Sequence, residues 1–166
     1  MGYLNGKPIG CISVVRYSSK FGFLGFYIVR PDQRGHGFGY RLWQAGMDYL
    51  EDCTVGLDGV VTQQDNYARS GFMLAHRNVR FGGNPQVEPP RDKRLRLVGP
   101  DLIAAVLAYD RLFFAAPRET FLRCWLRPEA RTAIAFVEDG TLKGYGVIRK
   151  CRDGYKNRTT LCRRRA

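Results

Sequence analysis

A glycine-rich turn is the part of the sequence best suited to chemistry. It reads Arg34-Gly35-His36-Gly37-Phe38-Gly39 and lies between an apolar segment and a helical pattern. The start of a helix exposes unpaired backbone N–H groups and the positive end of the helix dipole, and glycine lets a bulky anion approach them. This arrangement is typical of a phosphate cradle. On this pattern alone, a glycine-rich turn without any ligand is an equal alternative.

Two common phosphate motifs are excluded by the residues that follow the turn. No Gly-Lys-Ser/Thr sequence is present, which argues against a P-loop. The dinucleotide fingerprint G-x-G-x-x-G, begun at Gly35, requires glycine at position 40, where Tyr40 stands. A phosphate bound at this turn therefore belongs to another kind of ligand.

The residues around the turn predict the elements that position it. Residues 23–29 are apolar on both faces and predict a central strand. Residues 37–50 predict a helix, because Leu42, Gly46 and Leu50 fall on one face. The other elements predicted in this half are strands at residues 11–16, 55–62 and 72–81, and one or two helical turns within residues 63–70.

The second half of the chain begins after a segment rich in proline and glycine, residues 82–93, which predicts a linker. Helices are predicted at residues 101–110 and 118–126, and strands at 132–137 and 142–150. An Asp-Gly pair between these strands predicts a hairpin. Residues 157–166 contain too few apolar side chains to bury a face, so we expect a disordered basic tail without function.

Composition and charge exclude several classes of protein. The 166 residues are 45% hydrophobic and 25% charged, as in soluble globular domains. No apolar run approaches the roughly 20 residues that span a bilayer, and no secretory signal pattern opens the chain. The five cysteines form no C-x-x-C pair, which argues against a disulfide framework or zinc site and predicts a reducing, cytoplasmic location.

The net charge of +12 suits an anionic small ligand as well as nucleic acid. Many of the basic residues lie between Val147 and Ala166. No helix-turn-helix, zinc-finger or RNP-type pattern accompanies them, so neither nucleic acid nor a membrane is the expected partner.

Two motifs together resemble the GNAT N-acetyltransferase superfamily. Arg34, Gly37 and Gly39 stand at the fixed positions of its acetyl-CoA motif, R/Q-x-x-G-x-G/A. Downstream, the segment from Tyr67 to Phe72 resembles the superfamily's Y-x-x-x-G-F element. The resemblance covers about residues 7–81, and the motifs occur in the family's order with a helix and a strand between them.

The resemblance implies an α+β fold, in which a mixed and mostly antiparallel sheet is flanked by helices and a second, smaller α+β domain follows. It divides the chain into a partial acetyl-CoA-binding domain at 1–81, the linker at 82–93, a partial C-terminal GNAT-like domain at 94–156 and the tail at 157–166. The family's usual N-terminal elements have no counterpart, and the last predicted strand meets the basic tail. We therefore expect a chain truncated at both ends.

The resemblance also implies a mechanism in which an acetyl group moves from acetyl-CoA to a primary amine by direct attack, without a metal. Backbone amides of the turn would bind the pyrophosphate, and the strand before it would bind the pantetheine arm and polarise the thioester carbonyl. Tyr67 would give its proton to the CoA thiolate; a half-buried packing tyrosine is the alternative. The residues implied in cofactor binding are Tyr27, Ile28, Val29, Arg34, Gly35, His36, Gly37, Phe38, Gly39 and Asn66.

Other functions stay open beside this one. An acyl-CoA-binding module without turnover is the alternative, because the elements that would bind the acceptor are missing from the pattern. The acceptor itself is expected to be a small-molecule or peptide amine, and a homodimer is a further expectation. Asp58 is expected at the core edge or in solvent, and a structural role is expected for His76.

Overall fold

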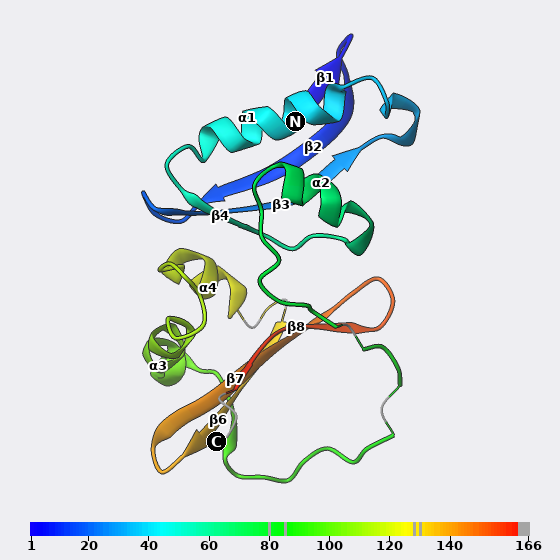
Figure 1. The fold of residues 1–166 in the computed structure, drawn as a ribbon. Helices are drawn as coiled ribbons and strands as arrows, with labels where there is room; N and C mark the ends of the chain where they lie inside the picture. Colours follow the sequence, from blue (N-terminus) through cyan, green and yellow to red (C-terminus); the bar gives the residue numbers. More distant parts are fainter. Residues whose placement is uncertain (80, 85, 128, 130, 163–166) are drawn as a thin grey trace. The chain divides into compact units, whose positions relative to one another are not determined.

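The computed structural model describes residues 1–79, 81–84, 86–127, 129 and 131–162. The chain divides into two compact units, Met1–Gln86 and Val87–Ala166, each with its own four-stranded sheet (Figure 1). The division lies within residues 82–93, the segment in which the sequence predicts a linker. None of the helices in these described ranges combines the length and apolarity needed to cross a membrane.

The first unit has a mixed sheet with the strand order β1-β2-β3-β4. The pairs β1–β2 and β2–β3 are antiparallel, and β3–β4 is parallel, with α1 as the connection between them. Its elements are β1 (Gly2–Leu4), β2 (Lys7–Arg16), β3 (Phe21–Val29), η1 (Pro31–Gln33), α1 (Phe38–Tyr49), β4 (Thr54–Leu57), η2 (Val61–Gln63) and α2 (Gln64–Arg69). The predicted central position of β3 is confirmed.

Helix α1 lies close against β2 and β3 (Figure 1). A side chain at Gly46 would place its Cβ 3.1 Å from Cγ2 of Val14, so glycine is what permits this close approach. Leu50 is buried at the end of the helix, where it fills the space beside Gly22. The helical face that the sequence predicts is therefore the face that packs on the sheet.

A bulge interrupts β3 at Phe26. Cys11 pairs with Ile28 and Ser13 with Gly25, so that two residues of β3 lie opposite one of β2. Phe26 has φ +47°, a left-handed conformation that costs energy for a side chain of this size. Its side chain is 71% exposed. The bulge thus places an extra residue in the strand just before its last three residues.

Two strands predicted in this unit differ from those observed. The strand predicted at 55–62 is shorter, since β4 ends at Leu57. The strand predicted at 72–81 is wrong, because its described residues have no regular structure. Met73 and Phe81 are 91% and 93% exposed, so the alternation of apolar and polar residues in this segment does not correspond to a buried face. The unpredicted strand β1 has three residues, too few for a detectable pattern.

The second unit has an antiparallel sheet with the order β5-β6-β7-β8. Its elements are β5 (Leu95–Leu97), α3 (Pro100–Asp110), α4 (Glu119–Trp125), β6 (Arg131–Glu138), β7 (Thr141–Lys150) and β8 (Tyr155–Cys162). The predicted hairpin is confirmed: Asp139 and Gly140 have φ +50° and +69° and join β6 to β7. The core of this unit gathers side chains from both helices and the two central strands, including Val106, Leu122, Ala135 and Val147.

The expectation of a disordered tail is wrong for residues 157–162. These residues belong to β8, which pairs with β7 from Lys150↔Tyr155 to Gly144↔Cys162. The prediction counted apolar side chains, whereas the free edge of β7 offers a ladder of backbone hydrogen bonds to any extended chain. Residues 163–166 lie outside the described residues.

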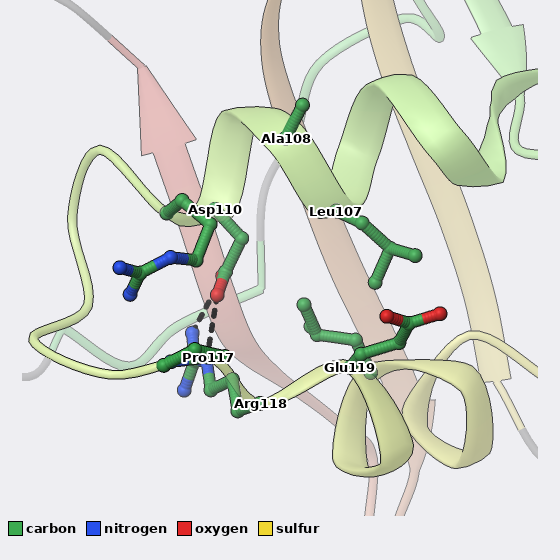
Figure 2. A pocket seen from close by; sticks show the side chains of 8 residues that line it. Leu107, Ala108, Asp110, Pro117, Arg118 and Glu119 are labelled. Atoms are coloured by element: carbon green, nitrogen blue, oxygen red, sulfur yellow. Dashed lines mark hydrogen bonds and ion pairs between the residues drawn. The ribbon is translucent and has the colours of Figure 1, made fainter. Parts of the chain in front are cut away.

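A buried carboxylate links the two helices of this unit to its sheet. Asp110 is 1% exposed, and Arg118 donates to it twice, from Nε to Oδ2 at 2.7 Å and from Nη2 to Oδ1 at 2.6 Å (Figure 2). The Tyr145 hydroxyl on β7 donates to the same Oδ1 at 2.6 Å. The guanidinium also lies over the ring of Phe114, 4.1 Å from its centroid. A charge that would be costly to bury alone is thus paired and hydrogen-bonded.

Asp110→Ala should lower the free energy of unfolding of this unit by about 3–5 kcal/mol, because it removes the buried carboxylate to which both Arg118 and Tyr145 donate. Glu119→Ala is the matched control. It breaks the exposed pair between Glu119 and Arg123 and should cost about 0.5 kcal/mol or less. Hydrogen exchange of the β6 and β7 amides at increasing urea measures both. Similar small losses in the two variants would contradict a structural role for the buried pair.

Burial raises the pKa of Tyr145, and its hydrogen bond to the Asp110 carboxylate raises it further. Below a pH of about 10, the phenol keeps its proton in both the folded and the unfolded state. Above this pH the unfolded chain loses the proton first, so the free energy of unfolding falls as the pH rises. Tyr145→Phe should remove up to about 1.4 kcal/mol per pH unit from this alkaline slope. Tyr155→Phe, which removes an exposed phenol from the same sheet, is the control in pH-dependent urea titrations. Equal slopes in both variants would refute the assignment.

Candidate functional site

The glycine turn connects β3 to α1 through two left-handed residues. Gly35 and Gly37 have φ +81° and +78°, and Gly37 is the N-cap of α1. A Cβ at either position would meet nothing within 4 Å, so the backbone conformation, rather than a lack of space, requires glycine here. The turn therefore brings its main chain to the surface at the start of the helix.

The backbone amides of residues 35–39 donate no hydrogen bond to any other described residue. They lie in and before the first turn of α1, a helix of 12 residues. The first amides of a helix have no partner within it, and the helix dipole adds partial positive charge at the same place. This set of amides fits a phosphate or pyrophosphate group.

Arg34, the arginine of the motif, connects the turn to the preceding strand through its side chain. Nε of Arg34 donates to the backbone carbonyl of Val29 at 3.0 Å, which ties the turn back to the end of β3. Before it, Gln33 and Arg30 both donate to the carboxylate of Asp32. The hydrogen bond from Gln33, and after it that from Arg30, holds the pKa of Asp32 below its ordinary value. The loop between strand and helix is thus fixed by local contacts.

Among the residues that the structure describes, the end of β3 has no partner strand on the side of β4. The two strands pair from Phe21↔Thr54 to Leu24↔Leu57, and β3 alone continues to Val29. The amide of Arg30 donates to the carbonyl of Ile9 at 2.9 Å, on the β2 side. Because main-chain groups alternate between the two sides of a strand, those of Val29 and Tyr27 face the open side. The main chain of Ile28 is turned toward β2 instead.

Tyr27 lies directly over the first turn of α1. A Cβ at Gly39 would be 2.7 Å from the Tyr27 hydroxyl oxygen and 3.2 Å from Cγ2 of Val29. Unlike the two left-handed glycines, Gly39 is therefore required for space. Burial raises the pKa of Tyr27, and the neighbouring phenol of Tyr67 raises it further. The Tyr27 phenol thus stays protonated beside the turn.

The Y-x-x-x-G-F element forms the end of α2. Gly71, with φ +86°, donates to the carbonyl of Ala68, and Phe72 donates to the carbonyl of Tyr67 at 3.1 Å. This pair of hydrogen bonds is a Schellman cap, which requires a left-handed residue at Gly71. The rings of Tyr67 and Phe72 both contact Trp43, with centroids 6.1 and 5.8 Å away. The spacing of the motif thus brings a tyrosine from α2 against α1.

The Tyr67 hydroxyl makes no hydrogen bond with the described residues, so its proton is available to a ligand. The side chain of the neighbouring Asn66 is used locally, since its Nδ2 donates to Oε1 of Gln63 at 2.6 Å. His36 is exposed and stacks on Phe38 in the turn. The structure therefore brings Tyr67 and the strand residues together, whereas Asn66 serves its own helix.

The two other titratable side chains considered in the sequence are both exposed. Asp58 is exposed and accepts a 3.4 Å hydrogen bond from Nδ2 of Asn78, and His76 is exposed. No group of three or more His, Cys, Asp or Glu side chains that could hold a metal occurs among the described residues.

Two residues of the site carried no functional signal in the sequence. Trp43 lies in the apolar stripe of α1, but its ring contacts come from β3 and from the end of α2, which periodicity within α1 does not reveal. A Cβ at Gly59 would be 2.6 Å from Cε2 of Tyr67, so this glycine makes room for the tyrosine ring. Nothing in the local sequence distinguishes it from an ordinary loop glycine.

Comparison with known proteins identifies the family. A model described as the acetyltransferase (GNAT) family matches residues 1–73, and one described as an acetyltransferase (GNAT) domain matches residues 106–157. The chain belongs to the GNAT superfamily. The resemblance drawn from the two motifs is thereby confirmed. The GNAT match in the first unit covers the glycine turn, the open end of β3 and Tyr67.

Among proteins similar to this chain, the holothin acyltransferase of Pseudoalteromonas sp. (strain SANK 73390) is 32% identical over 158 residues. The match covers 94% of this chain and 53% of that protein. An uncharacterized protein of Caenorhabditis elegans is 37% identical over 62 residues, which are 37% of this chain and 20% of that protein. The chain thus spans about half the length of the first relative.

Solved structures share the GNAT fold. A candidate acetyltransferase from Pyrococcus horikoshii has a TM-score of 0.69 at 16% identity, covering 96% of this chain and 53% of that one. A tandem GNAT protein from the clavulanic acid biosynthesis pathway has a TM-score of 0.54 at 16% identity, covering 98% and 62%. These likenesses confirm the α+β fold class.

Gly39→Ala should lower the free energy of unfolding of the first unit by about 1–3 kcal/mol, because the added methyl group overpacks the contact with Tyr27. Tyr27→Phe removes the oxygen at 2.7 Å, so it should recover about half of that loss in the double variant. Gly25→Ala, where a Cβ meets nothing within 4 Å, is the control and should change stability by about 0.5 kcal/mol or less. Hydrogen exchange of the α1 amides reports each value. A strictly additive double variant would show that Tyr27 does not set the space at Gly39.

Proposed function

We propose that this protein transfers an acetyl group from acetyl-CoA to a primary amine. The observation that carries the proposal is the set of unpaired amides at residues 35–39, which lies at the open end of β3. A tyrosine with an uncommitted hydroxyl lies close by, packed against α1. Family membership supports acyl transfer in general, and the 32% identical relative is named as an acyltransferase.

The residues of the turn fit the cofactor. The amides of residues 35–39 would bind the pyrophosphate, and the left-handed Gly35 and Gly37 would let it approach the backbone. Arg34 would act by holding the turn to Val29. The main-chain groups of Tyr27 and Val29 on the open side of β3 would bind the pantetheine arm. When bound, acetyl-CoA supplies an acetyl group activated as a thioester.

Tyr67 would act as the general acid. The neutral amine nitrogen of the acceptor attacks the thioester carbonyl carbon, a backbone N–H of β3 stabilises the oxygen, and the carbon–sulfur bond breaks. Tyr67 gives its hydroxyl proton to the departing sulfur and recovers a proton from solvent. The proton lost by the amine nitrogen leaves to solvent. No side chain of the described residues is assigned as a base, which fits the exposed positions of Asp58 and His76.

The acceptor would be a small-molecule or peptide amine. Because one relative is named holothin acyltransferase, holothin is a sensible member of a first panel of acceptors. A homodimer and a cytoplasmic location stay predictions.

An acyl-CoA-binding module without turnover is the second candidate. One observation favours it: Phe26 at the bulge and Ile28 beyond it lie on the face of β3 away from α1, and both are more than half exposed. The described part of the first unit places no helix over that face. A site that holds the thioester without enclosing an acceptor would bind acetyl-CoA and release no thiol.

Thiol release from acetyl-CoA with a panel of amines tests the proposal. Tyr67→Phe should lower kcat by about 100-fold and leave the Kd for acetyl-CoA nearly unchanged. Tyr49→Phe, which removes an exposed phenol from the far end of α1, is the control. Gly37→Val should weaken acetyl-CoA binding in calorimetry, because its backbone cannot easily adopt φ +78°.

Three results would decide between the candidates. An unchanged kcat in Tyr67→Phe removes Tyr67 from the mechanism. Equal affinity in Gly37→Val means that the turn does not hold the pyrophosphate. Saturable binding of acetyl-CoA without thiol release for any amine favours the binding module.

A further inference from the structure

Trp43 is the side chain through which the elements of the candidate site meet. It lies in the middle of α1 and is 6% exposed. Its ring contacts Tyr27 of β3 with centroids 5.6 Å apart, Tyr67 of α2 at 6.1 Å and Phe72 after α2 at 5.8 Å. Two segments that are distant in the sequence, the end of β3 and the end of α2, thus converge on one indole of α1.

Tyr67 is held by ring contacts rather than by hydrogen bonds. Its helix has only six residues, and its hydroxyl bonds to none of the described residues. The Cδ2–Cε2 edge of the ring lies against Gly59, where an added Cβ would be 2.6 Å from Cε2, and the ring stacks on Trp43 with 27° between the planes. The direction of the phenol oxygen is therefore determined by these two contacts.

Tyr27 contacts the indole of Trp43 from β3, whereas Tyr67 contacts it from α2. Tyr27 packs on Trp43 and lies over Gly39, in the first turn of α1. The strand that carries the open main-chain groups, the helix start that carries the unpaired amides and the helix that carries Tyr67 are thereby joined through one ring. A shift of Trp43 would move Tyr67 relative to the turn.

From this geometry we propose that Trp43 is a positioning residue, which holds the Tyr67 hydroxyl at the place where the leaving sulfur departs. The proposal rests on the function proposed above. A proton donor must lie within hydrogen-bond distance of the atom that it protonates, and a displacement of about 1 Å can cost about 100-fold in rate. The turn and the strand bind the rest of the cofactor, so its affinity does not depend on Trp43.

The test is a double-mutant cycle between Trp43→Phe and Tyr67→Phe on the full chain. Acetyl-CoA and the amine of the panel that releases thiol fastest are the substrates. Trp43→Phe should lower kcat by about tenfold, with KM for acetyl-CoA within about twofold. In the Tyr67→Phe background, the same change should lower kcat by less than about twofold, because there is no longer a proton donor to misplace.

Leu50→Ala is the matched control for loss of buried volume in the same part of the unit. Leu50 is 1% exposed and packs beside Gly22, away from Tyr67. The change should lower the melting temperature and leave the kcat of the folded protein within about twofold of the wild type. This control separates an effect on the position of the Tyr67 hydroxyl from an effect on the stability of the unit.

Gly59→Ala keeps the proposal testable if Trp43→Phe does not fold. Gly59 is exposed in the loop between β4 and η2, and an added methyl group there would press on the Tyr67 ring. It should lower kcat by about tenfold in the wild type and by less than about twofold in Tyr67→Phe.

The outcomes distinguish this inference from the function on which it rests. If Tyr67→Phe leaves kcat unchanged, the general-acid assignment is wrong and the inference falls with it. If Tyr67→Phe lowers kcat but Trp43→Phe lowers it equally in both backgrounds, the function stands and the positioning role of Trp43 is overturned. A rise in KM with unchanged kcat overturns it as well.

Discussion

The close packing of α1 on β2 is the contact on which the first unit depends. Every part of the candidate site is attached to that helix: the unpaired amides lie in and before its first turn, Tyr27 lies over that turn, and Tyr67 packs on its middle. Gly46 permits the approach, since a larger side chain would meet Val14. A helix held this closely carries its N-terminus to a fixed place, which is what recognition of a phosphate by backbone groups requires.

Much of this site could be predicted from the sequence because its signals are local. The glycine before the helix corresponds to the left-handed N-cap at Gly37, and the Tyr67-to-Phe72 spacing corresponds to the Schellman cap at Gly71. Each of these signals concerns a single turn of the chain. The roles of Trp43 and Gly59 could not be predicted, because each depends on a contact between segments far apart in the sequence. Side-chain pattern within one element does not contain that information.

The errors in the fold have the same origin. Residues 72–81 alternate like a strand yet form none among the described residues, whereas residues 157–162 lack a strand pattern and pair with β7. In both cases the deciding factor is whether a neighbouring strand offers its edge, which is a property of the sheet rather than of the segment. The buried Asp110 is similar: its carboxylate is stable in the core only because Arg118 and Tyr145 arrive from other elements.

The bulge at Phe26 decides which of two chemically similar surfaces of β3 faces the helix. If the nine residues of the strand alternated without interruption, Phe26 and Ile28 would follow Leu24 onto the α1 side. The extra residue instead turns Tyr27 and Val29 inward and leaves the two more apolar side chains outside. One backbone irregularity, costly for a phenylalanine, thus selects both the side chains beneath the helix and the main-chain atoms presented at the open edge.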